Sequence, residues 1–217
     1  MKHEATHPRK TGRPLSFDRD DVLNKAMLTF WQSGYETTSI SDLTAAMGVT
    51  APSLYAAFGN KQQLFLEAMR RYAGDPVALE QDITAAPTAH DAVAAMLRRA
   101  ALLYTGETTP PGCLLASAAA TGSPDAAEVR AAVAAERRAI RDMIQRRIEV
   151  DMGRGLLPSD TDPAPLADLA IAVMQGMSVL ARDGADRERL LAVAETAMLG
   201  WRVPARTHPT DISMHHP

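Results

Sequence analysis

The stretch "SISDLTAAMGVTAPSLYAAFGNK", residues 39–61, decides the fold, because it holds two short apolar helical patterns separated by a glycine. Ser39, with an aspartate three residues later, fits a capping box and predicts the start of the first helix. Gly48 supplies the turn, and Thr50 followed by Pro52 predicts the start of the second. Two helices so joined are typical of a helix-turn-helix, whose second helix reads base edges in the major groove of DNA.

Helical periodicity continues on both sides of this stretch and ends near Trp201. Ala and Leu favour helix and β-branched runs are scarce, so the sequence predicts an all-α chain. The segment between residues 74 and 87 is interpreted as a connection. Apolar stripes, cap residues and glycines predict about nine helices, over residues 18–33, 39–47, 50–58, 61–73, 88–104, 113–122, 125–152, 163–183 and 186–202.

The composition is that of a soluble globular protein, with 46% hydrophobic and 23% charged residues. Cys113 is the single cysteine and cannot form an internal disulfide, which fits a reducing cytoplasm. We find no apolar run approaching the roughly 20 residues of a membrane helix, and the polar N-terminus is no signal peptide. The expected location is therefore the bacterial cytoplasm, on DNA, with no membrane partner.

A further set of residues around the helix-turn-helix stands in a fixed order and spacing. Its members are Gly34–Tyr35, Thr37–Thr38, Gly48–Val49, Leu54–Tyr55, Phe58, Lys61 and Leu64. In these elements, residues 17–69 resemble the N-terminal domain of TetR/AcrR-type transcriptional regulators. The resemblance covers about a quarter of the chain, and the helices that follow resemble the family only in length and helical pattern. It implies a symmetric dimer, a ligand pocket in the C-terminal helices and repression that a ligand relieves.

This resemblance divides the chain into four parts. Residues 1–15 form a flexible basic arm, with four basic side chains against one acidic, on a chain of formal net charge −3. Residues 16–60 form the three-helix DNA-binding domain, and residues 61–203 the helical ligand-binding and dimerisation domain. Residues 204–217 have no periodicity and are expected to be a disordered tail.

The DNA-contacting positions are carried over from the family residue by residue. Thr38, at a helix start, is expected to donate to a phosphate, and the hydroxyls of Thr50 and Ser53 to contact phosphate or base. Tyr55 is expected to reach a phosphate, and Lys61 to supply charge. The full set is Arg13, Thr38, Ser39, Thr50, Ala51, Pro52, Ser53, Tyr55 and Lys61. Two alternatives remain open: Tyr55 as a core aromatic residue and Thr50 as a helix cap alone.

The second helix differs from the common family pattern, because it has no charged residue. Many relatives carry Lys or Arg where this chain has Ala51, and larger polar residues at Ala56 and Ala57. We expect the helix to use its dipole, hydroxyls and apolar fit, with Lys61 and the arm attracting phosphates. The "GRP" at residues 12–14 resembles the arm of some members, in which an arginine enters the minor groove. The alternative is a disordered arm that contacts nothing.

The C-terminal helices are expected to hold a small apolar ligand. Methionine adapts its shape, so a methionine-rich lining suits apolar ligands. The candidate lining residues are Met96, Leu103, Tyr104, Cys113, Leu114, Met143, Met174 and Met177. The alternative is that they are core residues. Cys113, at a helix start, is conceivable as a redox sensor or as a structural cysteine. We assign no metal and no cofactor, because no histidine cluster has metal-ligand spacing.

The last two helices, about 163–183 and 186–202, are expected to pair with their copies in a four-helix bundle that makes a homodimer. Two reading helices would then lie about 34–36 Å apart and read a palindrome. Other classes remain as alternatives: a helical protein-interaction module and a transcriptional activator. An enzyme is disfavoured because the chain lacks GxSxG, Walker, HExxH and dinucleotide-binding motifs, and no catalytic residue is assigned.

Overall fold

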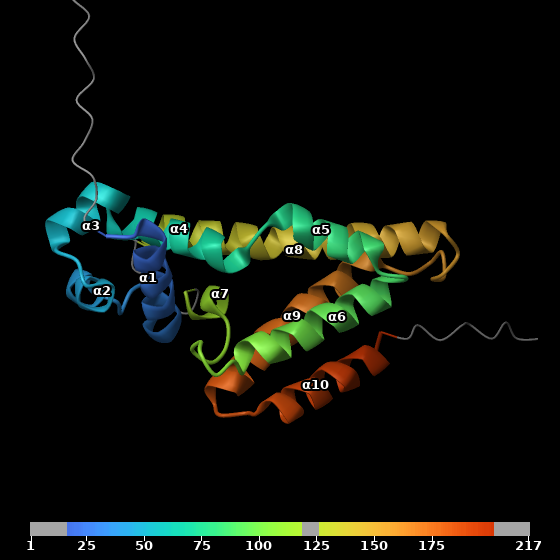
Figure 1. The fold of residues 1–217 in the computed structure, drawn as a ribbon. Coiled ribbons are helices and arrows are strands. Elements are labelled where there is room, and N and C mark those ends of the chain that lie inside the picture. The colour runs from blue at the N-terminus through green and yellow to red at the C-terminus, as the bar shows by residue number, and fades with distance from the viewer. Residues whose placement is uncertain (1–16, 119–125, 202–217) are drawn as a thin grey trace, which may run out of the picture.

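The computed structural model describes residues 17–118 and 126–201, and all regular secondary structure in these two ranges is helical (Figure 1). The helices are α1 (Arg19–Ser33), α2 (Ile40–Met47), α3 (Ala51–Phe58), α4 (Lys61–Ala73), α5 (Pro76–Ala85), α6 (Ala89–Tyr104), α7 (Leu114–Ser117), α8 (Ala127–Gly153), α9 (Pro163–Arg182) and α10 (Arg187–Leu199). The predicted all-α fold is confirmed. The predicted arm over 1–15, with Arg13, and the predicted tail over 204–217 lie outside the described residues.

Two segments differ from the prediction. The region interpreted as a connection contains α5, which starts at Pro76 under a cap from Asp75 and buries a single residue, Ile83. With so little of one face buried, α5 has no apolar stripe from which periodicity could predict it. The helix predicted over 113–122 is shorter, because α7 ends at Ser117, and residues 119–125 lie outside the description.

The helices form a head and a larger body. Helices α1, α2 and α3, here called the head, lie together at one end of the molecule, and α4 runs from the head into the body (Figure 1). In the body, α4, α5 and α8 form one row, and α6, α9 and α10 form a second row beside it. The pairs α8–α9, α6–α9 and α6–α10 are in extensive contact and hold the body together.

An aromatic cluster fixes the head. The ring of Phe65 on α4 meets Phe30 edge-on at 5.2 Å and Tyr35 at 5.1 Å between centroids. Leu43 on α2 and Leu54 on α3 are fully buried against this cluster. Burying each such side chain contributes about 1.5–3 kcal/mol. The short helices α2 and α3 are therefore held by packing rather than by their own length.

Helix α9 is more apolar than the sequence analysis allowed. It has 20 residues, with a mean hydropathy of 1.5 over its most apolar window, and by length and composition it could cross a membrane. The expectation that no segment approaches this length was wrong. The apolar surface of α9 is used in packing, since the helix contacts α6, α8 and α10.

Candidate DNA-binding interface

The turn between α2 and α3 is built by two caps and one glycine. The Ser39 side chain accepts a hydrogen bond from the Asp42 backbone N–H at 3.1 Å, and the Asp42 carboxylate accepts one from the Ser39 N–H at 2.8 Å, completing the predicted capping box. These bonds, with the Ser39 side chain first, lower the pKa of Asp42. Gly48 ends α2 with a φ of 70°, a left-handed conformation that favours glycine.

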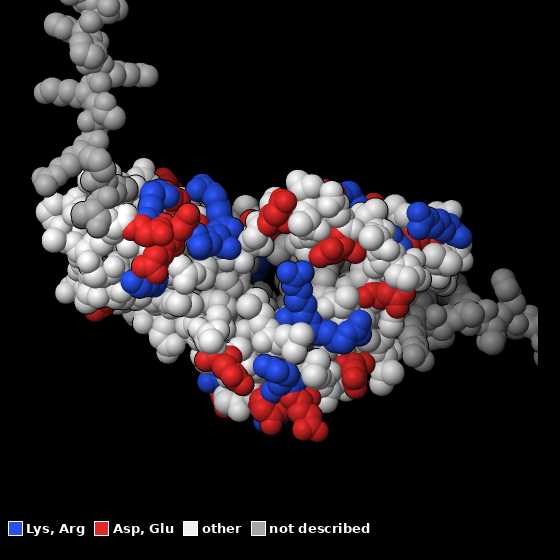
Figure 2. Space-filling model, in the orientation of Figure 1, with Lys and Arg blue, Asp and Glu red and all other residues white. Residues whose placement is uncertain are grey.

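Helix α3 presents an uncharged outer face. Leu54 and Phe58 are buried against α1, α2 and α4, so the remaining side chains face outward. Pro52 is exposed, and Tyr55 is 47% exposed, which rules out the alternative of a core aromatic residue. Ala51 and Ser53 are half-buried, and the surface over the head is largely free of charge (Figure 2).

The start of α3 carries hydroxyls. Thr50 caps the helix by accepting from the Ser53 N–H at 3.4 Å, and the two hydroxyl oxygens lie 2.9 Å apart. Pro52 has no N–H to satisfy, so the first turn is capped without charge. The positive end of the helix dipole and the two hydroxyls give this end of α3 the properties of an anion-facing surface.

Lys61 is held in place more firmly than the sequence indicates. Its Nζ donates to the Glu36 carbonyl oxygen at 3.3 Å and lies 4.6 Å from the centre of the Tyr35 ring. Burial lowers the pKa of Lys61, and the nearby Glu36 and Asp42 partly offset this effect. The charge therefore sits at a defined point at the start of α4, beside α2.

Thr38 does not take the predicted role. Its side chain is buried, and its hydroxyl donates to the Gly34 carbonyl oxygen at 2.6 Å. The prediction that this hydroxyl donates to a phosphate was wrong, because the turn after α1 leaves the Gly34 carbonyl in need of a donor. A threonine before a helix fits either role by sequence, and here the adjacent Ser39 provides the cap.

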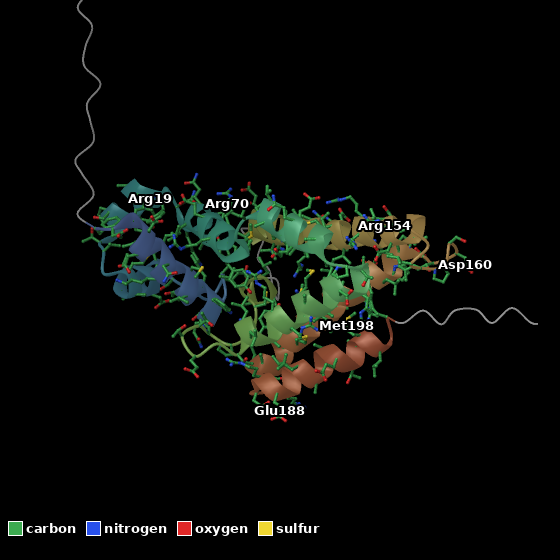
Figure 3. The ribbon with its side chains drawn as sticks, turned by 45° about the vertical axis from the view of Figure 1, so that its right-hand side comes forward. Arg19, Arg70, Arg154, Asp160, Glu188 and Met198 are labelled. Atoms are coloured by element: carbon green, nitrogen blue, oxygen red, sulfur yellow. The ribbon has the colours of Figure 1, made fainter. Side chains whose placement is uncertain are left out.

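Sequence reasoning missed the cations on α1 and α4 that border the head. Arg19 lies 4.5 Å from the centre of the Phe58 ring and pairs with Glu67 at 2.7 Å, while Arg71 pairs with Asp20 at 2.9 Å. Arg19 and Arg70 lie at the head end of the molecule in Figure 3. The ion pairs fix α1 against α4, and no local motif indicates such a long-range pairing.

The structure brings only part of the predicted ligand set together. Tyr104 and Cys113 are buried side by side, next to Leu114 and to Tyr72, which the sequence analysis did not include. The Tyr72 hydroxyl donates to the Cys113 Sγ at 3.3 Å, and burial raises the pKa of both tyrosines. The other predicted residues lie elsewhere: Met96, Met143 and Met174 are half-buried, Leu103 is 40% exposed, and Met177 is buried on α9.

Helices α9 and α10 form an apolar groove on the outside of the body. Its volume is about 770 Å³. Val179, at 56% exposure, stands out on this surface. The groove is lined by Val173, Gly176, Met177, Val179, Leu180, Arg189, Ala192, Val193, Thr196 and Ala197. A continuous apolar surface of this kind marks an interaction site in a soluble protein.

Comparison with known proteins agrees with this architecture. Residues 22–68 match the family of bacterial regulatory proteins called the tetR family, and residues 89–198 match the Tetracyclin repressor-like C-terminal domain. The chain is 36% identical over 193 residues to the HTH-type transcriptional repressor ComR of Escherichia coli strain K12, covering 88% of this chain and 91% of that repressor. It is 29% identical over 192 residues to the repressor BdcR of the same strain, covering 87% and 91%.

A solved structure shares the whole fold. A cysteine-mutant form of the TetR family transcriptional regulator CifR, complexed with 26-bp double-strand operator DNA, superimposes with a TM-score of 0.82. It is 42% identical to this chain and covers 88% of it, and all of that structure is matched. These relatives are transcriptional regulators rather than enzymes. The chain thus belongs to the TetR family of bacterial regulatory proteins, which are DNA-binding transcriptional regulators.

Proposed function

We propose that this protein is a cytoplasmic, homodimeric repressor that binds a palindromic operator through α3 and leaves it when a small apolar ligand binds the body. The observation that carries the proposal is the exposed outer face of α3, capped and turned by Ser39, Gly48 and Thr50 as a helix-turn-helix requires. The operator complex of the CifR relative supports the DNA-binding role. We assign residues 16–60 to DNA binding and residues 61–203 to ligand binding and dimerisation.

Specific contacts are assigned to the start of α3 and to its surroundings. Ala51 and Pro52 provide apolar contact suited to a thymine methyl group, and Thr50 and Ser53 provide hydroxyls. Tyr55 and Lys61 contact phosphates. Ser39 lies exposed at the start of α2, where the helix dipole favours a phosphate. Arg13 remains proposed for the minor groove.

The proposed dimer uses the groove between α9 and α10. Isologous packing of this surface on its copy buries Val179 and covers the apolar side of α9. Such an arrangement explains why a helix of a soluble regulator has the composition of a membrane helix. The proposed ligand site lies around Tyr104 and Cys113, between the head and the body.

Selection of bound sequences from a random duplex library tests the proposal. At about 50 mM and about 200 mM salt, the expected result is a palindrome whose half-sites lie about one helical turn apart. Enrichment of no sequence at either salt concentration would refute sequence-specific DNA binding and favour the protein-interaction module. The selected operator then serves in a screen of small apolar molecules for release of the protein.

Replacing Tyr55 with phenylalanine removes the hydroxyl and leaves the exposed ring in place. We expect operator affinity to fall about 5- to 10-fold, because one hydrogen bond to a charged phosphate is lost. The free energy of unfolding should stay within about 0.5 kcal/mol of wild type, since the side chain is outside the core. Fluorescence anisotropy with labelled operator measures the affinity. Unchanged affinity would exclude a phosphate contact by this hydroxyl.

Removal of residues 1–14 deletes the basic arm with Arg13. We expect weaker operator binding, and a slope of log affinity against log salt that is smaller in magnitude by about 1 to 3, because fewer counterions are released. Preference for A·T pairs flanking the half-sites should also decline. The measurement is a titration of operator at several salt concentrations. A slope equal to that of the full chain would show that the arm does not contact DNA.

A further inference from the structure

Arg182, in the last turn of α9, contacts the head directly. Its guanidinium donates to the Trp31 backbone carbonyl oxygen at 3.1 Å and also to the Ser117 hydroxyl. Trp31 lies in the last turn of α1, where carbonyl groups have no partner within the helix and favour a cation. The chain path between α9 and α1 is long, so this contact joins two elements that the sequence keeps 151 residues apart.

A second residue of α9 reinforces the same contact. Ser178, one turn before Arg182 on the same face of the helix, accepts a hydrogen bond from the Cys113 N–H at 2.8 Å. The preceding residue, Gly112, accepts from the Trp31 indole N–H at 2.9 Å. Two side chains of α9 thus hold both the carbonyl of Trp31 and the loop on which its indole rests.

Close packing leaves little freedom at this point. Gly112 has a φ of 80°, and a Cβ built on it would lie 2.8 Å from the Ser178 carbonyl oxygen and 2.9 Å from the Arg182 Nε. The loop and α9 therefore meet backbone to backbone, as only glycine permits. A small displacement of α9 or of the loop would be transmitted to the end of α1, because packed elements shift together.

We infer that Arg182 is a positioning residue for DNA recognition, which sets the orientation of the head relative to α9 and so the separation of the two α3 helices in the dimer. This inference rests on the proposed function. In the proposed dimer α9 is fixed at the two-fold axis, so its link to α1 bypasses the longer path through α4 and α8. The two half-sites of an operator are read only when this separation matches their spacing.

The test compares Arg182→Met with Arg98→Met on the selected operator and on operators lengthened or shortened by one base pair between the half-sites. Arg98 is exposed on α6, so its variant removes the same charge away from the head. Relative to that control, Arg182→Met is expected to bind the best operator about 10-fold more weakly, equivalent to one lost charge-assisted hydrogen bond. It is also expected to discriminate less between the three spacings.

The spacing profile separates positioning from general loss of stability, because a partly unfolded protein loses affinity for all three operators by the same factor. Arg182→Lys, which keeps the charge and most of the stem but presents one nitrogen, is expected to shift the profile less in the same direction. An Arg182→Met profile equal to that of Arg98→Met, with normal wild-type binding, would overturn the inference alone. Absence of operator binding by the wild-type protein would refute the proposed function and the inference with it.

Discussion

Substitution of Val179 with aspartate is expected to convert the protein to a monomer and to lower operator affinity by about 10³-fold or more. Val179 is 56% exposed in the single chain and borders the apolar groove between α9 and α10. In the dimer a carboxylate at this position would be buried without a partner and would face its own copy across the two-fold axis. A monomer holds only one half-site, so its binding approaches the non-specific level.

Sedimentation velocity at a fixed protein concentration measures the first effect and fluorescence anisotropy the second. Val77→Asp is the matched control, because Val77 is 59% exposed on α5, away from the groove, and introduces the same charge. The control should remain dimeric and bind operator with little change. A dimeric Val179→Asp variant with wild-type affinity would show that the interface lies elsewhere on the molecule.

Replacing Asp151 with alanine is expected to lower the free energy of unfolding by about 3–5 kcal/mol. Asp151 and Arg147, one turn apart on α8, form a buried ion pair at 3.1 Å. Asp151 also accepts from the Ala89 N–H at 2.5 Å at the start of α6, and Arg147 donates to the carbonyl oxygens of Thr84 and Pro87. Without Asp151 the guanidinium stays buried with an uncompensated charge, and the start of α6 loses an acceptor.

Urea unfolding at one protein concentration checks this result, because dimer stability depends on concentration. The neighbouring pair of Arg146 and Glu80 provides the control. It also joins α8 to α5, at 3.1 Å, but both side chains are more than half exposed. Glu80→Ala should cost less than about 1 kcal/mol. Equal losses in the two variants would contradict the account of a buried pair that fixes the α5–α6 connection.

The parts of the fold that are coded locally could be predicted from the sequence. The capping box at Ser39, the glycine turn at Gly48 and the cap at Thr50 depend on residues within one helical turn of each other, and all are present. The outward position of Tyr55 followed from the inward side chains Leu54 and Phe58. Helix α5 could not be predicted in the same way, because a helix with one buried residue has almost no periodic signal.

The site was predicted less well where side chains make distant contacts. Thr38 donates its hydroxyl to the preceding turn, and Lys61 reaches back to the Glu36 carbonyl, neither of which a sequence motif specifies. Arg182 and Trp31 meet only because α9 returns to the head after two further helices. Residues predicted to line one ligand pocket were divided between the buried pair of Tyr104 and Cys113 and several other places, because methionine and leucine serve a core as well as a pocket.

The most direct test of the central claim is an operator with about 5 bp inserted between its half-sites. Roughly half a helical turn of extra duplex moves one half-site to the opposite face of the DNA while leaving every base of both half-sites intact. A dimer with its two α3 helices on one face is expected to lose about 10³-fold in affinity, down to the non-specific level. Equal affinity for the two operators would contradict the account, because it would show that each chain reads DNA independently of a partner.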